Sequence, residues 1–114
     1  MQARYLTLLI VPLFSTAVLA AGYTGPGAKT INTVAAAQAA GDDIYVVLQG
    51  HIIRKLGDEK YEFKDSTGTI TVEIDDEDLP QVAFDDKTQV KLTGEVDKGL
   101  FQLDIDVDLL EITQ

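Results

Sequence analysis

Apolar and polar residues alternate along most of the chain after residue 43, which is the pattern of half-buried β-strands. Short polar or glycine-containing stretches divide this pattern into five segments. The five expected strands span Ile44–Arg54, Lys60–Asp65, Thr69–Asp75, Gln89–Asp97 and Phe101–Val107. A short helix is expected before them over Val34–Ala40, because Thr33 can cap its start and Gly41 can end it.

A glycine stands on the apolar face in the middle of the first and fourth segments. The shared pattern reads Val46-x-Leu48-x-Gly50-x-Ile52 and Val90-x-Leu92-x-Gly94-x-Val96. Glycine weakens a strand unless the backbone must bend sharply there or approach another backbone closely. Two long strands with this requirement predict a small closed barrel.

The number and lengths of the strands narrow the architecture further. An immunoglobulin-type sandwich needs about seven strands, and five are found. The expected fold is all-β: a five-stranded Greek-key OB-fold barrel with a short N-terminal helix preceding the first strand. After Val107 the alternation breaks, because Leu109 and Leu110 are adjacent and both apolar, which predicts a bulge or a strand end.

The N-terminus has the features of an export signal. Arg4 precedes an apolar stretch over Tyr5–Leu19, and Val18-Leu19-Ala20 resembles a signal-peptidase site. We therefore expect a cleaved signal peptide at 1–20, an irregular arm at 21–32 rich in glycine, and the OB-fold domain at 33–114. The expected location is the periplasm, with no stable membrane insertion after cleavage.

Composition restricts the class of partner. The chain has no cysteine, so burial and barrel closure must hold the fold without disulfides. Its formal net charge of −10 repels phosphates and anionic lipids and favours cationic partners. The same charge would also keep a small exported protein soluble, so it does not identify a ligand by itself.

Several short motifs resemble one known family, and they cover essentially the whole chain after the signal. These are Tyr23-x-Gly25-Pro26, Thr33-Val34-x-x-Ala37, Tyr61-x-Phe63-x-Asp65-x-x-Gly68-x-Ile70-x-Val72-x-Ile74-Asp75, Gly94-Glu95-Val96-Asp97-Lys98 and Ile105-Asp106-Val107. They resemble the bacterial OB-fold (BOF) family of small periplasmic stress-tolerance proteins. The resemblance implies an OB barrel, a role in envelope stress and no nucleic-acid binding. Members usually carry a tryptophan and a glycine after the third strand, where this chain has Leu79 and Gln81.

The residues themselves do not indicate an enzyme or a cofactor. After residue 20 the chain has one serine, Ser66, and one histidine, His51, which fall on different expected elements. The Asp104–Asp108 run resembles the start of a calcium loop, but Leu109 stands at the sixth position, where such a loop needs glycine. Nucleic-acid binding is also disfavoured, because Tyr61 and Phe63 are in phase with the core.

Two candidate binding surfaces follow from the barrel topology. OB folds bind ligands at the loops after the first and fourth strands. Here the candidate ligand-binding residues on those loops are Leu56, Gly57, Asp58, Glu59, Asp97, Lys98, Gly99 and Leu100. The ligand would be a cell-wall sugar, a small molecule or an envelope protein.

The second surface is acidic. In the OB topology the fifth strand lies between the third and the fourth, so their outward carboxylates form one face. This acidic face comprises Glu73, Asp75, Glu95, Asp97, Asp104, Asp106 and Asp108. It would capture a cationic peptide or a divalent cation. The first hairpin is expected to be basic, because it carries Arg54, Lys55, Lys60 and Lys64.

Overall fold

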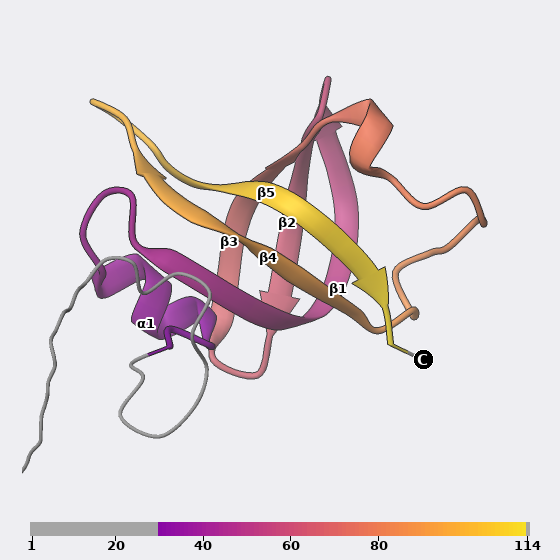
Figure 1. The fold of residues 1–114 in the computed structure, drawn as a ribbon, viewed down its shortest axis with the longest axis horizontal. Coiled ribbons are helices and arrows are strands. Elements are labelled where there is room, and N and C mark those ends of the chain that lie inside the picture. The colour runs from indigo at the N-terminus through magenta and orange to yellow at the C-terminus, as the bar shows by residue number, and fades with distance from the viewer. Residues whose placement is uncertain (1–29, 114) are drawn as a thin grey trace, which may run out of the picture.

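A computed structural model describes residues 30–113, which form a closed five-stranded barrel with one α-helix against it (Figure 1). The strands follow the order β1-β2-β3-β5-β4 around the barrel, which confirms the expected OB-fold topology. Only β3 and β5 run parallel. The elements are α1 (Val34–Ala39), β1 (Tyr45–Gly57), β2 (Lys60–Asp65), β3 (Gly68–Ile74), the 3₁₀ turn η2 (Asp76–Asp78), β4 (Val90–Lys98) and β5 (Leu103–Ile112).

Strand β1 changes its pairing partner at Gly50. It pairs with β4 from Tyr45 to Gly50 and with β2 from His51 onwards, so it belongs to both halves of the barrel. A Cβ atom at position 50 would lie 2.2 Å from the Lys64 carbonyl oxygen. The glycine therefore permits the close backbone approach that the sequence pattern predicted.

Gly94 has the same function on β4. A Cβ atom at this position would lie 2.1 Å from the carbonyl oxygen of Asp106 on β5. The register shifts at this point, since Thr93 pairs with Leu109 and Gly94 pairs with Val107. Asp108 is the extra residue of a bulge, which confirms the irregularity expected after Val107.

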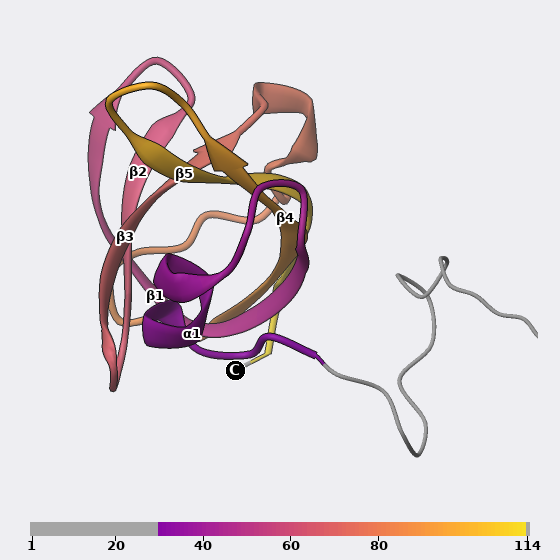
Figure 2. The same cartoon turned by 90° about the vertical axis from the view of Figure 1, so that its left-hand side faces the viewer.

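Alternating residues of all five strands fill the barrel, and α1 covers one end of it (Figure 2). Val34 and Ala37 of the helix are fully buried against the core. Thr33 caps the helix as expected, because its side-chain oxygen accepts the Ala36 N–H at 3.1 Å. The helix thus closes the barrel at the end where the β2–β3 turn also lies.

Strand β2 has the expected ends, β3 and β4 are shifted by one residue, and the largest differences are in β1 and β5. Strand β1 continues to Gly57, so the β1–β2 connection shrinks to a tight turn at Asp58 and Glu59. Strand β5 begins at Leu103 and continues past the bulge to Ile112. Periodicity could not reveal either extension, because both depend on pairing with a distant strand.

The expected signal peptide at 1–20 lies outside the described residues, as does nearly all of the expected arm. Within residues 30–113, the one α-helix is far too short to span a lipid bilayer.

Candidate functional site

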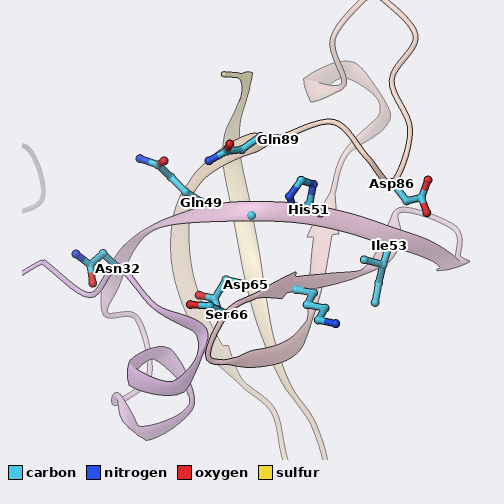
Figure 3. Close-up of a pocket in the computed structure, with 10 residues that line it drawn as sticks. Asn32, Gln49, His51, Ile53, Asp65, Ser66, Asp86 and Gln89 are labelled. Carbon is cyan, nitrogen blue, oxygen red and sulfur yellow. The ribbon is translucent and has the colours of Figure 1, made fainter. Parts of the chain in front are cut away.

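A polar groove of about 610 Å³ lies over the outer side of β1, and Figure 3 shows the residues around it. Three distant parts of the chain contribute to it: the segment before α1, the β2–β3 turn and the connection that leads into β4. Its lining residues are Asn32, Gln49, Gly50, His51, Ile53, Lys64, Asp65, Ser66, Asp86 and Gln89. Most of these side chains carry hydrogen-bonding groups, and amides and hydroxyls outnumber charges of either sign.

The position of His51 in the groove is fixed by its neighbour on the connection to β4. Its Nδ1 lies 3.0 Å from the carbonyl oxygen of Thr88. Since a carbonyl can only accept, Nδ1 is the donor of this hydrogen bond, and Nε2 is the ring nitrogen left for another partner. Ser66 lines the same groove from the β2–β3 turn, but no hydrogen bond joins it to His51 among the described residues.

Asp65 anchors the lower wall of the groove. One carboxylate oxygen accepts the Val34 N–H at 2.8 Å, and the other accepts the N–H groups of Thr67 and Gly68. Burial alone would raise the pKa of Asp65, but these hydrogen bonds and one from the Thr67 hydroxyl outweigh it and lower the pKa. This carboxylate therefore stays charged and ties α1 to the β2–β3 turn.

Two further hollows adjoin the groove along β1. One, of about 440 Å³, shares Asn32 and Gln49 with the groove and extends to Tyr45. The other, of about 410 Å³, shares Ile53 and Asp86 with it. The outer side of β1 is therefore followed along most of its length by a nearly continuous series of hollows.

The 410 Å³ hollow is the more apolar end of this series. Leu79 and Phe84 from the β3–β4 connection pack against the core there and line this hollow together with Tyr61. The ammonium group of Lys55 lies 5.7 Å from the centre of the Tyr61 ring. Leu79 stands near the place where the resemblance implies a tryptophan, so this position borders a hollow rather than open solvent.

The strand register brings the predicted acidic residues together. Asp97 pairs with Asp104, and Asp106 pairs with Glu95 on one side and Glu73 on the other. Burial raises the pKa of Asp106, and the negative charges of neighbouring carboxylates, Asp108 first among them, raise it further. Like charges lie directly opposite one another on this face, an arrangement that costs stability.

Lys60 lies in the first hairpin, as the sequence predicts, at the start of β2. Its ammonium group reaches the acidic residues, because its Nζ lies 2.5 Å from Asp104 Oδ2 and 3.5 Å from Glu73 Oε1. Strand periodicity gives the side of the sheet but not the reach of a flexible lysine chain, so this ion pair could not be predicted. Asp104 is also unlike its acidic neighbours, since it is only 7% exposed and its Oδ1 has no hydrogen-bond partner within residues 30–113.

Three carboxylates gather beside this ion pair. Glu59, Glu73 and Asp75 each offer an oxygen, and these oxygens lie within 4.8 Å of one another. The negative charge of Glu59 is the main cause that raises the pKa of Asp75. Glu59 is held in place because its φ of 59° forms the tight β1–β2 turn and its carboxylate accepts the Asp76 N–H at 3.0 Å.

The eight loop residues predicted to bind ligand form two separate turns. Leu56 and Gly57 end β1, and Asp58 and Glu59 form the turn that follows. The other four occupy the end of β4 and the β4–β5 turn. Both turns project from the upper end of the barrel in Figure 1, but their tips point apart, and none of the eight residues lines the three hollows described above.

The aromatic residues of β2 lie where the sequence predicted. Tyr61 is 8% exposed and Phe63 is fully buried, so both rings belong to the core. The outward residues of β3 are threonines and an acid. The β2–β3 surface that nucleic-acid-binding OB folds use for base stacking therefore lacks exposed aromatic rings here.

Comparison with known proteins places these features in a family. A family model described as bacterial OB fold (BOF) protein matches residues 13–112. The calcium-regulated OB-fold protein CarO of Pseudomonas aeruginosa is 54% identical over 98% of both chains, and the protein YgiW of Escherichia coli is 39% identical over 86% of this chain and 87% of its own. The solved structure of the E. coli hypothetical protein ygiW superimposes with a TM-score of 0.70 at 36% identity, and the match covers 81% of this chain and 98% of that one.

Proposed function

Because the chain belongs to the bacterial OB fold (BOF) family, we propose that it is a non-catalytic periplasmic binding module that acts in envelope stress tolerance. Its ligand would be a cell-wall sugar chain that lies along the outer side of β1. The observation that carries this proposal is the line of three adjoining hollows, of which the central one is rich in amide, hydroxyl and imidazole groups.

The chemistry of the central groove suits a sugar better than an ionic ligand. Amide groups such as those of Gln49 and Gln89 can donate and accept at once, as sugar hydroxyls do. Nε2 of His51 adds a hydrogen-bonding group, and Ile53 offers an apolar contact for the carbon atoms of a sugar ring. The lining has one positive and two negative groups, Lys64 against Asp65 and Asp86, so its net charge is small.

The hollows at the two ends of the groove make the whole site long enough for a linear sugar polymer. Tyr45 borders one end, and Tyr61 and Phe84 border the other. These aromatic side chains supply apolar contact area beside the polar hydrogen-bonding groups of the groove. A chain of several sugar units could therefore contact all three hollows, whereas a small molecule would occupy one.

Substitution of the two glutamines that line the groove is expected to lower its affinity for sugar chains. We expect the double substitution Gln49→Ala with Gln89→Ala to weaken binding to purified peptidoglycan fragments about tenfold, since two neutral hydrogen bonds of about 0.5–1.5 kcal/mol each would be lost. Isothermal titration at low and moderate salt measures this directly. Binding should change little with salt, because the contacts are mainly between neutral groups.

Gln81→Ala supplies the matched control. Gln81 is exposed on the β3–β4 connection and does not line the three hollows, so its loss should leave binding unchanged. Equal affinity of the double variant and the parent protein, or binding that disappears with added salt, would contradict the groove as the sugar site.

A second candidate function, divalent-cation binding, is favoured by the carboxylates of Glu59, Glu73 and Asp75. Carboxylate oxygens are the ligands that calcium prefers, and the relative CarO is described as calcium-regulated. Calcium at ten times its Kd would add about 1.4 kcal/mol of stability, which raises the Tm of a domain this size by roughly 6–11 °C.

Thermal unfolding in calcium, magnesium and sodium at matched ionic strength tests this second function. Asp75→Asn should abolish the calcium-specific rise, whereas Asp58→Asn, in the turn that contains Glu59 but outside the cluster, should keep it. Identical Tm shifts with calcium and sodium would show that the ions only screen the negative charges, and this would contradict a specific calcium site in the cluster.

A further inference from the structure

The β4–β5 hairpin exposes two large apolar side chains at its tip. Leu100 is 93% exposed and Phe101 is 99% exposed, which makes them the most exposed large apolar residues among residues 30–113. The connection between β4 and β5 spans residues 99–102. Because the Gly99 N–H donates to the Gln102 carbonyl at 2.8 Å, Leu100 and Phe101 form its tip. Such turn positions favour small or polar residues, and neither side chain contributes to the core.

The stem of the hairpin is braced, so the tip is held away from the barrel (Figures 1 and 2). Asp42 accepts the Lys98 N–H at 2.8 Å, and the Asp43 N–H donates to the Val96 carbonyl at 2.7 Å. Val96 also donates its N–H to the carbonyl of Ile44 at 2.9 Å. The loop before β1 thus fixes the direction in which Leu100 and Phe101 project.

Negative charge lies directly behind this apolar tip. The strands that form the stem carry the outward carboxylates of Glu95, Asp97, Asp106 and Asp108. Repulsion from these groups disfavours an anionic bilayer, and it equally disfavours the same hairpin of a second copy. The surface is complementary to a partner that has both apolar and positively charged groups.

We propose that the β4–β5 hairpin docks a basic amphipathic peptide segment of another polypeptide. The apolar side chains of the segment cover Leu100 and Phe101, and its lysines and arginines face the carboxylates along β4 and β5. This inference rests on the acidic face but not on the sugar site or on cation binding by Glu59, Glu73 and Asp75. It adds an apolar anchor that charge alone does not provide.

A synthetic amphipathic helix of leucine and lysine is the probe, and fluorescence anisotropy of the labelled peptide measures its affinity for the protein as purified. Leu100→Ser with Phe101→Ser should weaken binding at least tenfold, because two apolar side chains that the peptide would bury are lost. Asp106→Asn with Asp108→Asn should also weaken it and should reduce its dependence on salt. Val82→Ser, which removes another exposed apolar residue from the β3–β4 connection, should have no effect.

Further arms separate this proposal from the alternatives. A lysine–serine peptide of equal charge should bind at least tenfold more weakly than the leucine–lysine peptide. Equal binding of the two peptides would show that the acidic face binds cations, but it would contradict the proposed contact with Leu100 and Phe101. Binding of phosphatidylglycerol vesicles in place of the peptide, or Leu100-dependent self-association without peptide binding, would also overturn it. Because all substituted side chains are exposed, no variant should have a lower Tm than the parent protein, which would show that every variant is folded.

Discussion

Alanine at position 94 is expected to lower the free energy of unfolding by about 3 kcal/mol, the largest effect of any single substitution considered for this chain. The new Cβ would lie 2.1 Å from the Asp106 carbonyl oxygen and 3.0 Å from the Val107 Cα. Both are backbone atoms of β5, so neither can move without separating β4 from β5 beside the bulge. The corresponding fall in Tm is roughly 12–24 °C for a domain of this size.

Urea unfolding of three glycine variants tests this expectation. Gly50→Ala should resemble Gly94→Ala, because its Cβ would meet the Lys64 carbonyl oxygen at 2.2 Å. Gly57→Ala is the matched control in β1, since nothing lies within 4 Å of a Cβ there, and it should be neutral or slightly stabilising. If all three variants had similar stabilities, the two mid-strand glycines would not be needed for barrel closure.

The glycine pattern shows why the fold could be predicted from the sequence. Gly50 and Gly94 interrupt otherwise regular apolar faces, and only a close backbone approach accounts for a missing side chain on the buried side of a strand. Strand alternation and the Thr33 cap are likewise local signals. Together they give the barrel, its helix and the bulge after Val107, which the structure confirms.

The groove could not be predicted in the same way. Its walls come from Asn32, from the β2–β3 turn and from Asp86 and Gln89, and no periodic pattern places these segments beside β1. The outward residues of β1 gave one available signal, because Gln49 and His51 occupy polar positions on the face opposite the core. That signal identifies a solvent-facing strand, but the hollows depend on the connection between β3 and β4.

Lys60 is the clearest case in which tertiary structure changed the interpretation of a residue. Sequence position alone groups it with Lys55 and Lys64, whereas its ammonium group lies beside Glu73 and Asp104 on the acidic face. It is the one cation that forms an ion pair with the carboxylates of this face among the described residues. Its removal should therefore reveal how strongly the acidic face depends on a positive charge.

Lys60→Met should lower the free energy of unfolding by about 2–3 kcal/mol at neutral pH. Removing one partner of a buried ion pair costs about 3–5 kcal/mol, and partial exposure of the lysine reduces that figure. The loss arises because the buried Asp104 carboxylate would have no remaining hydrogen-bond partner in the described residues. Lys64→Met, an exposed lysine on the same side of β2, should cost less than about 0.5 kcal/mol.

A second substitution and a pH series separate this ion pair from simple loss of packing. Lys60→Met combined with Asp104→Leu should recover most of the loss, since an apolar pair can replace a buried ion pair without penalty.

The hydrogen bond to Asp104 is the main cause that raises the pKa of Lys60 above 10.5. A raised lysine pKa gives stability that is complete below pH 10.5 and is lost as the pH rises through the folded-state value. The difference between the parent protein and Lys60→Met should therefore be constant from pH 7 to about 10 and shrink above it. A difference that persisted unchanged at higher pH would mean that the lysine stabilises the barrel through its methylene chain rather than through its charge.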